Sequence, residues 1–335
     1  MTDVPPLPVH SSSRLEAIQA PVREQLDRVV DELRRIIASD FEIQDEVNTY
    51  LLGMRGKLFR PTLLLLASDA CGDPDADALA LAAVVELVHL ATLVHDDAVD
   101  HSVLRRGLPT VNQLWNHQVA IIAGDFLYSR SILELTRIGR IEAIRALASA
   151  SNEMSVGELR QLISFDALDF TEEDYYRLIS CKTASLMGAA CELGALVGDN
   201  ALRSPFRRYG EALGMAFQIA DDLLDYEGSE ASTGKPVGHD LRERKVTLPL
   251  VEALRRCSRG DRELVRAFFT RVDPADEEIA SIVTLVQSNG GLDYARMQAR
   301  HYAEVAEAAL SEIPASGEAM DALHAALAYA IERSR

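Results

Sequence analysis

Residues 86–100 read ELVHLATLVHDDAVD, and this stretch is the most informative in the chain. Its apolar residues recur at helical spacing and predict a buried helix. The helix is predicted to end in the pattern D-D-x-x-D, formed by Asp96, Asp97 and Asp100. Asp96 and Asp100 lie four residues apart, so they share one face of a helix, where unpaired like charges are destabilising. These carboxylates therefore need a positive charge nearby.

The same pattern occurs a second time at residues 221–225, DDLLD, again after apolar helical sequence. Carboxylates without neighbouring His or Cys ligands suit Mg²⁺, which keeps waters and takes further ligands from substrate phosphates. The pair of motifs predicts a diphosphate held through Mg²⁺ between facing helices of a bundle. The alternative is two solvated helix ends in an acidic protein. The repetition after apolar helices favours the functional interpretation.

The rest of the chain predicts an all-α fold. No proline occurs between Val111 and Ser204, and apolar residues recur there at helical spacing. Residues 1–12 are rich in Pro and Ser and are predicted to be a disordered tail. Pro21 is predicted to bend or split the first helix. The breaks between helical segments are too short for linkers, so residues 13–335 are predicted to form one domain.

Composition limits the possible partners. The 335 residues carry 34 Lys+Arg against 52 Asp+Glu, a formal net charge of −18, which argues against general nucleic-acid binding. No run of 18 apolar residues predicts a membrane span. The four cysteines form no CxxC pair, and no secretory signal is visible, so we expect a reduced cytoplasmic protein. Association with membranes is expected to be peripheral at most.

Basic residues that suit a diphosphate occur close to the first aspartate motif. Residues 53–61, GMRGKLFRP, place Lys57 and Arg60 in a glycine-flanked stretch, and Arg105-Arg106 follows Asp100 by five residues. Arginine can bind phosphate bidentately, whereas lysine acts as a compact point charge. An isolated Arg-Arg pair is most often a solvated surface pair. Its position just beyond the aspartates favours phosphate binding here.

Other catalytic motifs are absent from the sequence. The segment around Gly234-Lys235-Pro236 lacks the spacing and the Ser/Thr of a P-loop. No G-x-G-x-x-G, G-x-S-x-G or zinc-type His/Cys spacing is present.

Taken together, these residues resemble the trans-prenyltransferases, also called isoprenyl diphosphate synthases or polyprenyl synthetases. The resemblance runs from about Tyr50 to the C-terminus, and its motifs occur in family order: GKLFRP, ELVHLATLVHDDAVD, RRG, GELRQ, KTA, FQIADDLLD and GKPVGHDLRERKVTLP. It implies an all-α bundle around a deep central cavity and a homodimer. It also implies head-to-tail condensation of isopentenyl diphosphate with an allylic diphosphate, with three Mg²⁺.

The resemblance also implies roles for individual residues. Isopentenyl diphosphate would be bound by Lys57, Arg60, His89 and Arg106. The allylic diphosphate would be bound by Arg105, Lys182, Lys235 and Lys245. The metal ligands would be Asp96, Asp100 and Asp221. Further carboxylates would support them through waters or hydrogen bonds, namely Asp97, Asp222 and Asp225. All four lysines of the chain are among these positions.

The implied chemistry agrees with these residue types. The oxygens of Thr183 and Gln218 would stabilise an allylic cation while Lys182 holds the departing diphosphate. That diphosphate is the expected acceptor of the final proton, as in the family. His89 lies seven residues before Asp96, two helical turns along the same face, which favours a site residue over a core histidine.

Product length in this family depends on side chains before the first aspartate motif. Ala91 and Thr92 occupy the fifth and fourth positions before it, and neither is aromatic. We therefore expect an all-trans product of C30 or longer, although a short-chain C15–C20 synthase stays open. A class I terpene cyclase is disfavoured, because Asp225 and Ser229 do not match its second motif. A non-catalytic subunit of a heteromeric synthase is disfavoured because both aspartate motifs are intact.

Overall fold

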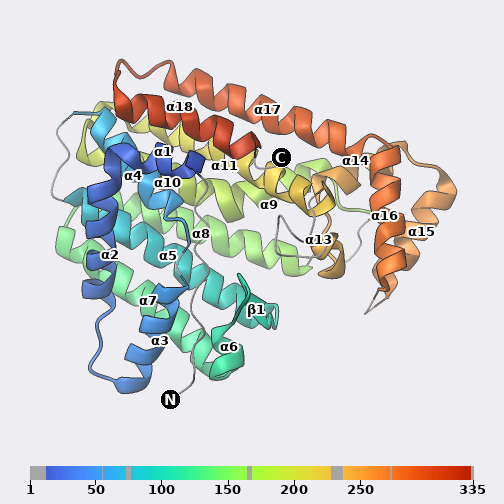
Figure 1. Ribbon diagram of the computed structural model, residues 1–335, viewed down its shortest axis with the longest axis horizontal. Helices are drawn as coiled ribbons and strands as arrows, with labels where there is room; N and C mark the ends of the chain where they lie inside the picture. The colour runs from blue at the N-terminus through green and yellow to red at the C-terminus, as the bar shows by residue number, and fades with distance from the viewer. Residues whose placement is uncertain are drawn as a thin grey trace. The chain divides into compact units, whose positions relative to one another are not determined.

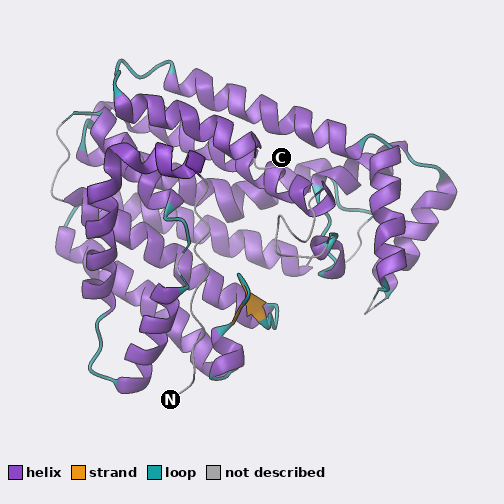
Figure 2. Cartoon of the chain, viewed as in Figure 1, coloured by secondary structure: helices purple, strands orange, loops and turns teal. Residues whose placement is uncertain are grey.

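The computed structural model describes residues 13–54, 56–72, 77–163, 168–227, 237–271 and 274–332. These residues are almost wholly helical, and the strands within them are the two-residue β1 (Leu104–Arg105) and β2 (Leu108–Pro109), which pair antiparallel (Figure 2). The predicted all-α class is confirmed. The predicted tail, residues 1–12, lies outside the described residues.

The helices follow one another with short connections (Figure 1). The first part of the chain forms α1 (Ser13–Gln19), η1 (Ala20–Val22), α2 (Arg23–Ile37), α3 (Glu42–Gly53), α4 (Phe59–Ala70), α5 (Asp77–Val99), α6 (Val111–Leu114), α7 (His117–Ile138) and α8 (Ile141–Ile163). The remainder forms α9 (Glu172–Ile179), η2 (Ser180–Ala184), α10 (Ser185–Val197), η3 (Asn200–Leu202), α11 (Arg203–Glu227), α13 (His239–Arg242), α14 (Leu248–Arg256), α15 (Arg259–Thr270), α16 (Asp276–Ser288), α17 (Gly291–Leu310) and α18 (Glu318–Ile331). The predicted break at Pro21 is confirmed, because a 3₁₀ turn separates α1 from α2 there.

The chain divides into two compact units. The first unit comprises Met1–Ser149, Ala189–Arg207 and Ile313–Ala326. The second unit comprises Ala150–Gly188, Arg208–Glu312 and Leu327–Arg335. The first aspartate motif belongs to the first unit and the second motif to the second unit.

Helix α5 is the centre of the first unit. It packs against α2, α4 and α7, and every residue from Ala80 to Val88 is buried. Among the described residues, it is the helix long and apolar enough to cross a membrane by length and composition alone. However, 72% of that apolar window is buried inside the protein, as in the central helix of a packed domain. The hydrophobic packing of α5 therefore fixes the position of the aspartates at its end.

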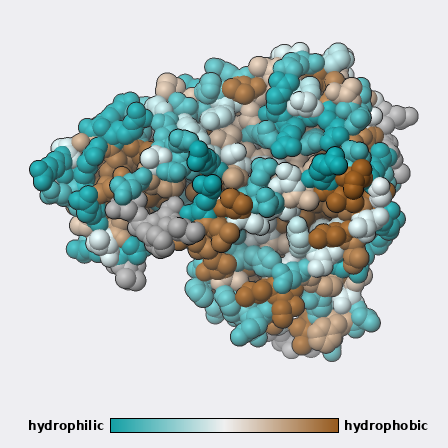
Figure 3. Space-filling view, turned by 180° about the vertical axis from the view of Figure 1, so that it is seen from behind, coloured by the Kyte–Doolittle hydropathy of each residue, from teal (hydrophilic) through white to brown (hydrophobic). Residues whose placement is uncertain are grey.

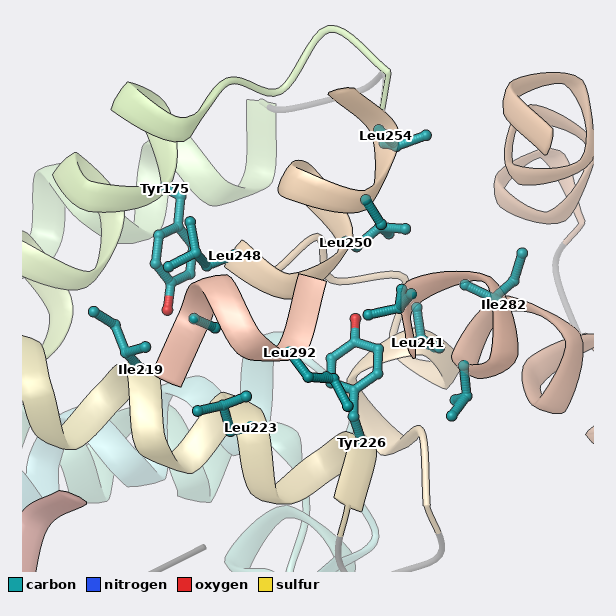
Figure 4. Packing of buried hydrophobic residues seen from close by; sticks show 14 of the residues in the cluster. Tyr175, Ile219, Leu223, Tyr226, Leu241, Leu248, Leu250, Leu254, Ile282 and Leu292 are labelled. Carbon is teal, nitrogen blue, oxygen red and sulfur yellow. The ribbon is translucent and has the colours of Figure 1, made fainter. Parts of the chain in front are cut away.

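The second unit has a hydrophobic cluster built by α9, α11, α14, α16 and α17 (Figure 4). Two helices approach closely at Gly291, the first residue of α17, where a Cβ atom would lie 2.1 Å from the carbonyl oxygen of Pro249. A second close approach occurs at Gly214 of α11, where a Cβ atom would lie 2.6 Å from the Cα atom of Ala184. Gly214 therefore lets α11 pack tightly against η2, which carries two of the predicted site residues.

Candidate active site

The first aspartate motif continues the last turn of α5. The backbone N–H of Asp100 donates to the carbonyl of Asp96 at 2.8 Å, so both side chains share one face as predicted. Asp97 points elsewhere and is 5% exposed. Its Oδ2 accepts a hydrogen bond from Nε of Arg105 at 2.7 Å, while its buried Oδ1 has no partner among the described residues. A buried carboxylate oxygen without a hydrogen-bond donor lowers the stability of the folded protein unless a water, ion or ligand binds it.

The hairpin of β1 and β2 brings the two arginines back to α5. Arg105 contacts Asp97, and Arg106 occupies the turn with a φ of 54°. Nη1 of Arg106 donates to the carbonyl of Met54 at 2.8 Å. A Cβ atom on Gly56 would lie 2.5 Å from Nη2 of Arg106, so this guanidinium lies directly against Gly56. The loop before α4 and the hairpin therefore meet at Arg106.

Arg60, Arg105 and Arg106 form a cluster of like charge around His89, which we call the guanidinium cluster. Burial and, to a smaller extent, the charge of Arg106 lower the pKa of Arg60 to about 10. Burial lowers the pKa of His89 well below its usual value, and all three arginines act in the same direction. His89 is therefore a neutral imidazole beside positive charges.

Among the described residues, Glu86 compensates part of the charge of the guanidinium cluster. Glu86, which is 2% exposed, opposes the lowering of the pKa of both Arg60 and Arg106. Nε of Arg60 is buried and has no hydrogen-bond partner among the described residues. A bound anion would supply both the missing acceptor and the missing negative charge.

The loop that carries Lys57 is held by a residue that sequence analysis did not identify. Nε2 of Gln19, at the end of α1, donates to the carbonyl of Lys57 at 2.7 Å and contacts Oγ1 of Thr62 at 3.0 Å. Leu58 stands between them in a left-handed conformation with a φ of 51°. Lys57 itself is exposed. Gln19 is polar and lies 38 residues away in sequence, so no local pattern indicates its role.

Backbone strain is concentrated at the motifs. The described residues include four non-glycine residues with positive φ, namely Leu58, His101, Arg106 and Arg244. Each belongs to a predicted motif or directly adjoins a predicted site residue. Such conformations cost about 1–3 kcal/mol each and persist where the surrounding structure holds them. The strain thus lies at or next to residues that the sequence predicts to bind ligands.

In the second unit, Lys182 and Thr183 lie in η2, a five-residue π-helical turn. Such bulges inside α-helical sequence occur frequently at functional sites. Nζ of Lys182 donates to Oε1 of Gln161 at 2.8 Å and forms an ion pair with Glu158 at 2.6 Å. Both partners belong to the GELRQ segment of α8, which sequence analysis recognised as a motif without assigning roles to its residues.

Thr183 is the first member of a chain of hydrogen bonds. Its Oγ1 donates to Oε1 of Gln218 at 2.7 Å, and Nε2 of Gln218 donates to Oδ1 of Asp222 at 2.8 Å. The hydroxyl of Tyr175 donates to Oδ2 of the same aspartate at 2.5 Å. Burial, followed by the charge of Asp222, raises the pKa of Tyr175 well above its usual value. Tyr175 was not predicted as a site residue.

The second aspartate motif has two kinds of carboxylate. Asp221 is exposed, whereas Asp222 is 5% exposed. Asp225 binds the start of α13, because its Oδ1 accepts from the N–H of His239 at 2.9 Å and its Oδ2 from that of Asp240 at 3.1 Å. Asp225 therefore orders the segment that carries Asp240.

Asp240 is a second carboxylate that sequence analysis missed. Burial, together with the charge of Asp225, raises the pKa of Asp240 to about 6, although Lys245 opposes the shift. Nζ of Lys245 forms an ion pair with Glu243 at 2.6 Å. Asp240 lies inside the motif GKPVGHDLRERK. Unlike the aspartates of the D-D-x-x-D motifs, it is not part of a repeated carboxylate pattern that would indicate a site. Lys235 lies outside the described residues.

A preformed metal cage is not present in the part of the chain that the structure describes, where no group of three or more His, Cys, Asp or Glu side chains is placed to hold an ion. The donors nonetheless fit a hard cation, because they are carboxylate oxygens. The buried Oδ1 of Asp97 without a partner adds one unsatisfied acceptor beside them.

A family model described as polyprenyl synthetase matches residues 42–286 of the chain. The chain belongs to the polyprenyl synthetase family. The predicted family is therefore confirmed, and with it the prediction of a prenyltransferase that makes prenyl diphosphates.

Individual relatives cover most of the chain. It is 36% identical over 301 residues to the all-trans-nonaprenyl-diphosphate synthase (geranyl-diphosphate specific) of Rhodobacter capsulatus. The aligned residues cover 89% of this chain and 92% of that protein. It is 38% identical over 266 residues to the geranylgeranyl diphosphate synthase of Mycobacterium tuberculosis, covering 78% and 76% respectively. The crystal structure of a polyprenyl synthase from Caulobacter crescentus CB15, complexed with calcium and isoprenyl diphosphate, has a TM-score of 0.90 at 33% identity, covering 98% of this chain and 99% of that chain.

Proposed function

We propose that this member of the family condenses isopentenyl diphosphate head to tail with an allylic diphosphate in a Mg²⁺-dependent reaction. The observation that carries this proposal is the guanidinium cluster beside the first aspartate motif, with a neutral His89 between the arginines. An anion bound there would gain charge-assisted hydrogen bonds, and the adjoining carboxylates would gain a cation. A diphosphate bound with a divalent metal supplies both.

In the proposed reaction, the residues of each unit have separate tasks. Arg60, Arg106 and Lys57 bind isopentenyl diphosphate, and His89 donates a hydrogen bond to it without adding charge. In the second unit, Lys182 binds the departing allylic diphosphate. Thr183 and Gln218 present oxygen atoms to the carbon from which it departs. The departed diphosphate accepts the final proton.

We propose Asp96, Asp100 and Asp221 as the residues that hold Mg²⁺, with waters and diphosphate oxygens completing the coordination. When bound, the metal supplies positive charge to the leaving group. The calcium and isoprenyl diphosphate in the Caulobacter crescentus structure support a divalent ion in this family. Asp225 would act indirectly, by holding the segment that carries Asp240 and Lys245.

Removal of either proposed metal ligand tests this function. Asp96→Asn and Asp221→Asn should each lower turnover by about 10³-fold at saturating Mg²⁺, because several kcal/mol of leaving-group stabilisation are lost. The matched control is Asp293→Asn, whose side chain is 87% exposed in α17, and it should retain wild-type turnover. The assay follows incorporation of labelled isopentenyl diphosphate. Near-normal turnover in a folded Asp96 or Asp221 variant would contradict the assignment.

We propose further that the product is C30 or longer. The relatives named above include both a geranylgeranyl and a nonaprenyl diphosphate synthase, so similarity alone does not select a length. Thr92 is partly exposed on the face of α5 that carries His89 and Asp96. Ala91 is 2% exposed and shares a face with His95, which packs against Gly124 of α7. Neither residue has the bulk to stop a growing chain.

An aromatic residue on the Thr92 face should therefore shorten the product. Thr92→Tyr is expected to shift the longest product to C15–C20 while early additions continue. Ala91→Tyr should shorten it too, but with a loss of stability of about 1–3 kcal/mol because the site is fully packed. Thr284→Tyr, at an exposed position of α16, is the control. Chromatography of dephosphorylated products gives the lengths. Unchanged product lengths in both variants would refute the role of Ala91 and Thr92 in limiting the product.

The finer prediction of a homodimer also has a structural basis in the first unit. Helix α7 exposes large apolar side chains in two groups three turns apart: Ile121 (41%), Ile122 (62%), Ile132 (44%) and Leu133 (59%). Hydrophobic residues are also visible among hydrophilic ones on the face shown in Figure 3. Exposed apolar faces of this kind mark interaction sites. We propose that a second copy of the chain covers α7.

Light scattering tests the proposed dimer. The wild-type protein should have twice the mass of the 36.8 kDa chain. Ile122→Glu combined with Leu133→Glu should give monomers, because charges would be buried in the apolar interface. Met297→Glu, at a 54% exposed position of α17, should leave the mass unchanged. A monomeric wild-type protein would exclude the interface.

A further inference from the structure

Tyr175 is a buried tyrosine of α9 that belongs to none of the motifs that define the family resemblance. It is 1% exposed and packs in the hydrophobic cluster of the second unit with Ile219 and Leu223. Figure 4 shows its hydroxyl pointing toward the helix that carries these two residues. There the hydroxyl donates to Oδ2 of Asp222 at 2.5 Å. Its only polar atom is therefore directed at the aspartate motif.

Asp222, whose orientation is fixed in part by the Tyr175 hydroxyl, also contacts Gln218. Its second oxygen, Oδ1, accepts from Nε2 of Gln218 at 2.8 Å. The Tyr175 hydroxyl donates to the other oxygen, so both oxygens of Asp222 accept and the amide nitrogen of Gln218 faces Asp222. The amide oxygen then faces the other way, toward Thr183. The orientation of this amide thus follows from its partners.

The orientation of Gln218 in turn determines where the hydroxyl proton of Thr183 lies. Oγ1 of Thr183 is 2.7 Å from Oε1 of Gln218, which can only accept, so the threonine hydroxyl donates. With its proton committed to Gln218, the hydroxyl of Thr183 keeps its lone pairs for another partner. If the amide were flipped, Thr183 would accept from it instead and direct its proton elsewhere.

We propose that Tyr175 is a positioning residue that acts through Asp222 and Gln218 on the hydroxyl of Thr183. This inference rests on the proposed function, in which Thr183 faces the allylic carbon. In that reaction the C–O bond breaks and its electron pair leaves with the diphosphate, so positive charge develops on the carbon. Oxygen lone pairs stabilise that charge, whereas a hydroxyl proton pointing at the carbon opposes it.

Loss of the Tyr175 hydroxyl should act on the chemical step more than on substrate binding. In Tyr175→Phe, Oδ2 of Asp222 loses its donor, so the carboxylate is free to rotate and Gln218 loses its fixed orientation. The single-turnover rate of the first condensation should fall about 10–100-fold, which is less than the about 10²–10³-fold typical of a direct contact, because Tyr175 acts through two other residues. The Michaelis constants of both substrates should change by less than about threefold, because Tyr175 is buried and is not among the residues proposed to bind either diphosphate.

Tyr226→Phe is the matched control for this experiment. Tyr226 is 2% exposed in the same hydrophobic cluster, and its hydroxyl lies 3.2 Å from Oγ1 of Thr247 rather than in the chain that ends at Thr183. The same single atom is removed from a buried tyrosine in both variants. A general packing effect predicts equal rate losses, whereas the proposed role predicts a clear loss in Tyr175→Phe alone.

A double-mutant cycle separates a positioning role from a structural one. Because Tyr175 acts through Thr183, Tyr175→Phe should lower the rate by less than about threefold when Thr183 is already replaced by Val. A structural defect would lower the rate equally in both backgrounds. Equal losses in the two backgrounds, or an unchanged rate in Tyr175→Phe, would overturn the inference.

A rescue variant keeps the test decisive if Tyr175→Phe folds poorly. Tyr175→p-aminophenylalanine keeps the ring and an N–H donor, so it should restore the rate to within about fivefold of wild type while preserving the coupling to Thr183. Failure of this folded variant to restore the rate would also overturn the inference. Failure of the proposed function is recognised separately, because the wild-type protein would then not join isopentenyl diphosphate to an allylic diphosphate.

Discussion

Like charges held close together on apolar helices are the constraint on which the rest of this structure depends. In the first unit, Arg60, Arg105 and Arg106 surround His89, and burial suppresses the charge of the imidazole. In the second unit, Asp221, Asp222 and Asp225 follow one another within five residues, and Asp240 joins them. Gathering like charges opposes folding, so the hydrophobic packing of α5 and α11 has to hold them in place. Phosphate oxygens would compensate the arginines, and a divalent cation would compensate the aspartates.

Hydrogen bonds to backbone groups orient these side chains and the segments that carry them. Gln19 holds the loop of Lys57, Met54 holds Arg106 through its carbonyl, and Asp225 holds the start of α13. The left-handed conformations of Leu58 and Arg106 occur where these bonds act. The binding side chains are therefore oriented before any ligand arrives, which reduces the entropy lost on binding.

The elements that sequence analysis predicted well are those with a periodic signal. The apolar spacing before Asp96 predicts α5, and Asp96 and Asp100 lie on one face because the helical turn continues to Asp100. The π-helical turn at Lys182 and Thr183 has no such signal, because its sequence is compatible with an ordinary helix. Contacts between distant residues, such as Gln19 with Lys57 and Tyr175 with Asp222, depend on tertiary packing and leave no pattern in the sequence. Lys182 shows the same dependence on tertiary packing. The KTA motif predicts it as a site residue, but the sequence does not indicate its partners Glu158 and Gln161.

Thermal unfolding with inorganic diphosphate and Mg²⁺ tests the central claim most directly. A ligand that binds only the folded protein raises the unfolding midpoint in proportion to its binding free energy. If the arginine and aspartate clusters are built for a diphosphate bound with metal, the two additives together should raise the midpoint by more than the sum of their separate effects. A combined shift equal to that sum, or no shift at all, would contradict the account.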